Sequence, residues 1–199
     1  PVTIGSRPPI HQSSITASHY ALDSHAVRKR EEGRVHLDGF LSYPSAVYTV
    51  PYGVMVPKEV GNLLLPVPVS GSHIGFSTLR MEPCWMAMGQ AAGIASALSI
   101  DGKVKVQNID LSRLQDKLVD QKATLMYFKD VDYTSPHFRM VQYLGLRGYL
   151  PEWTARLQEP VDMATLTAWK KLSGKDLPGI EAGKTTRLVA LEMIYRKIK

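Results

Sequence analysis

A loop of small and polar residues at positions 70–78 holds the groups best suited to chemistry in this sequence. It reads SGSHIGFST, and a helix-forming stretch follows after Pro83. The first N–H groups of a helix have no partner within the helix, and that end carries partial positive charge. A polar loop leading into a helix therefore favours a ligand that presents an anion or a carbonyl oxygen.

His73 is the side chain in this loop that could exchange protons near neutral pH. It alone of the six histidines lies in the loop. The alternative is a histidine whose ring nitrogens are bonded to neighbouring backbone groups, which is the commoner situation in folded proteins. The sequence leaves both interpretations open.

Two elements have to position this loop. The apolar residues 63–69, between Asn62 and a Ser-Gly pair, predict a buried strand. Residues 83–100 carry no charge and are rich in Ala, Met, Leu and Gly, which predicts a buried helix with Pro83 in its first turn. Cys84, the single cysteine, is expected to be a small buried residue of that helix rather than a reactive thiol.

The stretch SGSHIGFSTLRMEPCWMAMGQAAG, residues 70–93, resembles the C-terminal flavin-contacting segment of the FAD-dependent oxidoreductase family. Some members of that family are labelled xanthan lyases. The preceding YTVPYGVMVPKEVGNLLLPV, residues 48–67, is similar to the strand and loop that lead into the segment. The resemblance is specific over residues 47–98 and weaker from position 19 to about position 128.

The resemblance implies a site as well as a family. Residues 70–80 and the first turns of the helix would lie along the flavin end of FAD, where backbone amides would bond a carbonyl oxygen of the isoalloxazine. The implied cofactor-binding residues are Ser70, Gly71, Ser72, Ser77, Thr78, Leu79, Gly89, Gln90 and Gly93. His73 and Arg80 are the implied catalytic residues, with Arg80 beside the anionic flavin or a substrate carboxylate. A structural ion pair with Glu82 explains Arg80 equally well.

The implied fold is α/β, namely the C-terminal portion of an FAD-binding flavoprotein fold with few strands and a long buried helix. The G-x-G-x-x-G fingerprint that holds the FAD pyrophosphate does not occur in the sequence. We therefore expect a missing N-terminal FAD-binding region, and we expect the chain alone to retain FAD weakly or not at all. Pro66 and Pro68 stand where many members carry a Gly-Arg or Gly-Lys type pair, which leaves the contact at the strand end open.

The composition changes after Phe128, so we assign residues 1–130 to the flavoprotein segment and 131–199 to a small helical module. Strands are expected at 35–41 and 46–51. Helices are expected at 111–123 with Asp110 as N-cap, from Ser135 to Gly148, at 161–173 and at 185–199. The sequence pattern SPHFRMVQYLGLRGYLPE, followed by a predicted helix, is weakly similar to surface-layer-homology and wall-binding repeats.

Composition and charge narrow the possible partners. A net charge of +6 over 199 residues is modest, and no block of Lys and Arg with interleaved aromatics argues for nucleic acid. Gln90 and Pro83 favour a core helix over a membrane span at 83–100. The spacing of His19, Asp23 and His25 gives no shared face, so we predict no metal site. The sequence does not decide whether the protein is periplasmic, secreted or cytoplasmic.

The sequence thus predicts the flavin-side part of an FAD-dependent oxidoreductase that acts on a small-molecule or sugar-derived substrate. One alternative is a non-catalytic module whose basic helical tail holds an anionic polysaccharide or wall polymer. A polysaccharide lyase is a further alternative, which only the label of some relatives suggests.

Overall fold

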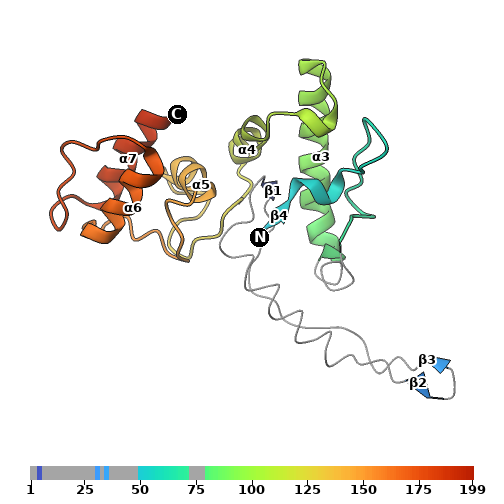
Figure 1. Ribbon diagram of the computed structural model, residues 1–199, viewed down its shortest axis with the longest axis horizontal. Coiled ribbons are helices and arrows are strands. Elements are labelled where there is room, and N and C mark those ends of the chain that lie inside the picture. Colours follow the sequence, from blue (N-terminus) through green and yellow to red (C-terminus); the bar gives the residue numbers. More distant parts are fainter. Residues whose placement is uncertain (1–3, 6–29, 32–33, 36–48, 72–78) are drawn as a thin grey trace. The chain divides into compact units, whose positions relative to one another are not determined.

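The computed structural model describes residues 4–5, 30–31, 34–35, 49–71 and 79–199 of the chain. The chain divides into two compact units, Pro1–Leu118 and Val119–Lys199 (Figure 1). The boundary falls within helix α4 (Leu111–Asp120). The division at residue 130, which rests on composition, stays a prediction.

Helix α3 (Glu82–Gly102) is the long helix of the first unit and confirms the helix predicted after Pro83 (Figure 1). Its buried side chains are Cys84, Met88, Ala91, Ala92, Ala95, Leu98 and Ser99. They recur every three or four residues, so one face of the helix packs against its own unit. No helix in the described ranges is long and apolar enough to cross a membrane.

The prediction of a buried strand at residues 63–69 is wrong. The structure has a loop there, in which Leu63 is 38% and Val67 47% exposed. Pro66 and Pro68 explain the difference, because a proline has no N–H to give to a neighbouring strand. An apolar run with two prolines cannot form all the backbone hydrogen bonds of a central strand in a sheet.

The loop is tied instead to the 3-10 helix η2 (Tyr52–Met55). The N–H groups of Leu65 and Ser70 donate to Met55 O and Val54 O, each at 2.8 Å. The Tyr52 hydroxyl donates to Val106 O at 2.9 Å, and burial raises the pKa of Tyr52 to about 12. These bonds hold the polypeptide that leads into the candidate site.

The strands in the described residues are each two residues long. β1 (Ile4–Gly5) pairs in parallel with β4 (Val50–Pro51), and β2 (Arg30–Glu31) pairs antiparallel with β3 (Arg34–Val35). Most of the strand predicted at 35–41, and the start of the one at 46–51, lie outside the described residues. Helices are therefore the main regular structure of the described part, and the α/β expectation has only these short pairs in its support.

The second unit contains α5 (Phe138–Leu146), α6 (Met163–Ser173) and α7 (Arg187–Ile198). All three confirm predicted helices. Gly148, with φ +83°, follows α5 as the sequence predicts. A left-handed glycine of this kind is a common helix terminator.

Side-chain caps fix where these helices begin. Asp162 accepts from the Thr165 N–H at 2.8 Å, and Thr186 accepts from the Val189 N–H at 3.4 Å. In α4, Asp110 accepts from the Ser112 N–H at 2.8 Å, which confirms it as the N-cap. Such caps satisfy helix donors that have no intrahelical acceptor.

The core of the second unit extends back before residue 131. Met126 and Phe128 belong to it, together with the buried faces of α5, α6 and α7. A Cβ added at Gly145 of α5 would lie 3.0 Å from Phe128 Cζ. The absence of a side chain at Gly145 is therefore what lets the 126–128 segment pack against α5.

Candidate cofactor site

Four predicted site residues, Ser72, His73, Ser77 and Thr78, lie outside the described residues. The other seven are described and fall into two groups. The groups are the loop ends Ser70, Gly71, Leu79 and Arg80, and the α3 residues Gly89, Gln90 and Gly93.

The loop ends combine an anchored backbone with exposed polar groups. Ser70 and Gly71 are exposed, and the Ser70 N–H is already bonded to Val54 O. Leu79 is buried, and Arg80 is exposed just before α3 begins. The backbone is thus held on both sides, while Arg80 stays accessible to a ligand.

The first turn of α3 has few backbone donors to offer. Pro83 has no N–H, and the N–H groups of Cys84 and Trp85 donate to Met81 O at 2.9 and 3.1 Å. The Glu82 carboxylate adds negative charge where the helix end carries partial positive charge. This helix end therefore suits a neutral carbonyl better than a diphosphate.

The glycine pair of α3 lies on an open surface. Gln90 and Gly93 are exposed and Gly89 is half-buried, and a Cβ at either glycine would meet no described atom within 4 Å outside its own helix. Met86 and Ile100, spaced to share the face of Gln90 and Gly93, are 74% and 75% exposed. The close packing predicted for the glycines therefore has no partner among the described residues.

Trp85, in the first turns of α3, is a candidate site residue that the sequence does not single out. Its indole Nε1 is buried, and it has no acceptor among the residues the structure describes. A buried donor without an acceptor costs about 1–3 kcal/mol. A tryptophan in an apolar helix gives no sign in the sequence of whether its N–H finds a partner, so only the structure reveals it.

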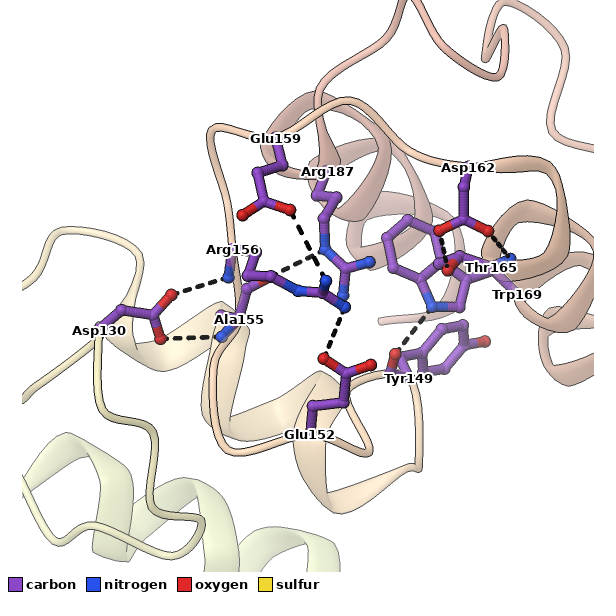
Figure 2. A network of polar contacts seen from close by, with 10 residues as sticks. All are labelled: Asp130, Tyr149, Glu152, Ala155, Arg156, Glu159, Asp162, Thr165, Trp169 and Arg187. Atoms are coloured by element: carbon purple, nitrogen blue, oxygen red, sulfur yellow. Dashed lines mark hydrogen bonds and ion pairs between the residues drawn. The ribbon is translucent and has the colours of Figure 1, made fainter.

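A second polar cluster lies in the Val119–Lys199 unit (Figure 2). The Asp130 carboxylate accepts from the N–H groups of Ala155 and Arg156 at 2.8 and 2.7 Å. This carboxylate holds Arg156 at φ +51°, a conformation that favours glycine. Arg187, only 4% exposed, donates from Nε to Ala155 O at 2.9 Å.

The charges of this cluster compensate one another. Arg156 pairs with Glu152 at 2.6 Å and with Glu159 at 3.7 Å. Burial lowers the pKa of Arg187, and the positive charge of Arg156 lowers it further, while Glu152, Asp162 and Glu159 act in the opposite direction. We assign the cluster a structural role, because its contacts join segments that are distant in the sequence.

A metal site has no support in the described part of the chain. No three His, Cys, Asp or Glu side chains gather there in a way that could hold a metal ion. His19, Asp23 and His25 lie outside the described residues.

Comparison with known proteins identifies the family. The model of the family described as FAD dependent oxidoreductase matches residues 7–118, more than half of the 199 residues. The matched range includes every predicted site residue and ends where the first compact unit ends, at Leu118. No curated protein and no solved structure matches the chain. The chain belongs to the FAD-dependent oxidoreductase family.

Proposed function

We propose that residues 70–93 form the flavin-side wall of the cofactor site in an FAD-dependent oxidoreductase. The observation that carries the proposal is the open face of α3 at Gly89 and Gly93, within the range of the family match. A helix face without side chains lets a planar ring or another backbone approach closely. The dinucleotide-binding part of the site would come from another segment of the parent protein.

Two further observations fit the flavin end of FAD rather than its diphosphate. The buried indole N–H of Trp85 has no acceptor among the described residues, and the isoalloxazine ring carries carbonyl oxygens and ring nitrogens that accept. Glu82, at the start of α3, would repel a diphosphate. The sequence also has no G-x-G-x-x-G motif to cradle one.

The roles proposed for the polar residues follow from their chemistry. FAD, when bound, supplies the capacity to accept or return a hydride or an electron pair. Arg80 would place a permanent positive charge beside an anionic acceptor or a substrate carboxylate. His73 would hold or move a proton at its imidazole. The substrate would be a small organic or sugar-derived molecule.

The visible absorption spectrum tests the proposal. The purified chain is mixed with FAD, excess cofactor is removed, and the remaining absorption is compared with that of free FAD. We expect little or no retained flavin in this chain, and a retained, perturbed flavin band in a longer chain that includes a glycine fingerprint on the N-terminal side. A longer chain that stays colourless would contradict the proposal.

A second candidate function, binding of an anionic polysaccharide, rests on a cluster of cations and tyrosines in the second unit. The guanidinium of Arg147 lies 3.4 Å from the ring centroid of Tyr143, which meets Tyr195 edge to face at 5.2 Å. Lys199 Nζ lies 5.2 and 5.4 Å from the two ring centroids. Cations held on aromatic rings are positioned to meet acidic groups on a sugar chain. Polysaccharide lyase activity stays an untested hypothesis.

Affinity electrophoresis distinguishes this candidate from the first. The chain is run through gels that contain alginate, an acidic polysaccharide, or dextran, a neutral one. Retardation by alginate alone, lost in the double variant Arg147→Gln and Lys199→Gln, would support the candidate. Lys184→Gln is the matched control, because Lys184 is exposed and pairs locally with Glu181 at 2.8 Å. If alginate retards every variant no more than dextran does, each relative to its own mobility in a gel without polysaccharide, the candidate is excluded.

A further inference from the structure

A hollow of about 420 Å³ lies in the first unit at the C-terminal end of α3. Ser96, Ser99 and Ile100 of the helix, Lys103 and Lys105 after it, and Asn62 from the preceding loop contribute to its walls. The last residue of the candidate flavin site, Gly93, lies three residues before Ser96 on the same helix, about 4.5 Å along its axis. The volume of the hollow falls in the range of about 300–1,000 Å³ that small-molecule sites occupy.

The walls of the hollow are fixed by hydrogen bonds. The Lys103 and Val104 N–H groups donate to Ile100 O and Ser99 O at 3.1 and 3.0 Å, which closes the end of α3. Gln107 Nε2 donates to Val60 O at 3.0 Å and ties the loop before Asn62 to the 3-10 helix η3 (Val106–Asn108). The hollow is thus part of the folded unit.

Two residues of the wall have a left-handed backbone, in the region that favours glycine. Asn62 has φ +55° and Lys103 has φ +50°. Asparagine tolerates this conformation, whereas lysine is strained in it. A glycine at the end of α3 would close the helix with less strain. The backbone conformation therefore does not explain why position 103 is a lysine.

The hollow is electropositive. Lys103 and Lys105 bring two full positive charges, against a partial charge of about −0.5 at the end of a helix. Asp101, on the last turn of α3, does not line the hollow. The charge balance therefore favours a ligand with a negative group.

The other walls add two kinds of contact. The Ser96 hydroxyl donates to Ala92 O at 2.8 Å, so its lone pairs remain to accept from a ligand hydroxyl. The Asn62 amide can both donate and accept. Ile100, which is 75% exposed, offers an apolar surface to the C–H face of a sugar ring.

We propose that this hollow binds a small hydroxylated anion, that is, a sugar or polyol that carries a carboxylate or a phosphate. Lys103 and Lys105 take the anionic group, while Ser96 and Asn62 bond the hydroxyls. The hollow adjoins the proposed flavin-side wall on α3 but shares no residue with it, and the proposal does not rest on flavin binding.

Backbone NMR of the full, isotope-labelled chain tests the proposal. Glucuronate and glucose 6-phosphate are titrated separately, with glucose as the neutral control. We expect either acidic sugar to shift the amide resonances of residues 62 and 96–106, and glucose to leave them in place. Which acid binds more tightly identifies a carboxylate or a phosphate as the recognised group. Shortening the Debye length from about 30 Å to about 3 Å with salt should abolish the shifts.

Lys103→Gly is the decisive variant, because it removes the ammonium and relieves the strained backbone at once. We expect affinity for the acidic sugar to fall roughly tenfold, as the loss of a charged hydrogen bond implies, while the unfolding temperature holds or rises. Lys117→Gln, at an exposed α4 position, should bind as the unaltered chain does. Unchanged affinity in Lys103→Gly, or no shift with either acidic sugar, would overturn the proposal.

Discussion

The side-chain amide of Gln142 bonds both backbone polar groups of Met126. Its Oε1 accepts from the Met126 N–H and its Nε2 donates to Met126 O, each at 2.7 Å. The same Oε1 accepts from the Leu125 N–H at 2.7 Å, and the side chain is fully buried. One residue of α5 therefore satisfies three backbone groups of the segment that enters the second unit.

Gln142→Leu should lower the free energy of unfolding of the second unit by at least about 3 kcal/mol. The leucine leaves three buried backbone groups without partners, and each such loss costs about 1–3 kcal/mol. Urea unfolding followed by tryptophan fluorescence measures the change. Gln158→Leu, at an exposed position, is the control and should change stability by less than about 0.5 kcal/mol. Equal effects of both substitutions would refute this assignment.

Trp85→Phe should leave the chain as stable as before or more stable, since it removes a buried donor that has no acceptor in the described part of the chain. Trp169→Phe is the matched comparison, because that indole Nε1 donates to Tyr149 O at 2.8 Å. We expect it to destabilise the chain by about 1–3 kcal/mol. Calorimetry compares the two variants. If the longer, flavin-binding chain also loses cofactor on Trp85→Phe, the indole serves FAD; unchanged retention would remove Trp85 from the site.

The sequence predicts best where the signal is local. The four helices from α4 to α7 are visible in apolar periodicity, and Asp110 and Gly148 mark ends through their own backbone chemistry. The run at 63–69 misleads because apolar composition indicates burial, whereas the two prolines decide the hydrogen bonding. Gln142 and Trp85 show what a sequence cannot give. Gln142 finds partners 16 and 17 residues away, and Trp85 finds none in the described residues.

The backbone at Arg156 can be tested by comparing Arg156→Gly with Arg156→Ala. Both variants lose the ion pairs to Glu152 and Glu159, but only glycine relieves the φ of +51°. We therefore expect the glycine variant to be more stable than the alanine variant by about 1 kcal/mol. Chemical unfolding of the two proteins gives the difference directly. An alanine variant that equals or exceeds the glycine variant would show that the left-handed backbone carries no strain.

The N-cap of α6 should make stability depend on pH in the acid range. Hydrogen bonds from the Thr165 hydroxyl and N–H lower the pKa of Asp162 below its ordinary 3.8. Because the folded pKa is the lower one, this contribution is present above the unfolded pKa and is lost as the pH falls through the folded pKa. In Asp162→Asn the asparagine still caps the helix but does not titrate. The unfolding midpoint of this variant should therefore fall less steeply as the pH is lowered. Thr165→Ala should weaken this pH dependence in part. If neither variant changes it, Asp162 is not its source.

Substituting alanine at Gly89 and Gly93 distinguishes an effect on the stability of this chain from an effect on FAD binding in the complete site. Outside its own helix, a Cβ at either position meets no described atom within 4 Å, so each substitution should stabilise the chain by about 0.5–1 kcal/mol through helix propensity. In the longer, flavin-binding chain the same methyl groups would stand where a ring or backbone has to approach, and FAD retention should fall. Gly145→Ala is the contrast, because its Cβ would lie 3.0 Å from Phe128 Cζ and should destabilise the second unit without affecting FAD. Undiminished flavin binding in Gly89→Ala and Gly93→Ala would mean that the open face of α3 does not meet the cofactor.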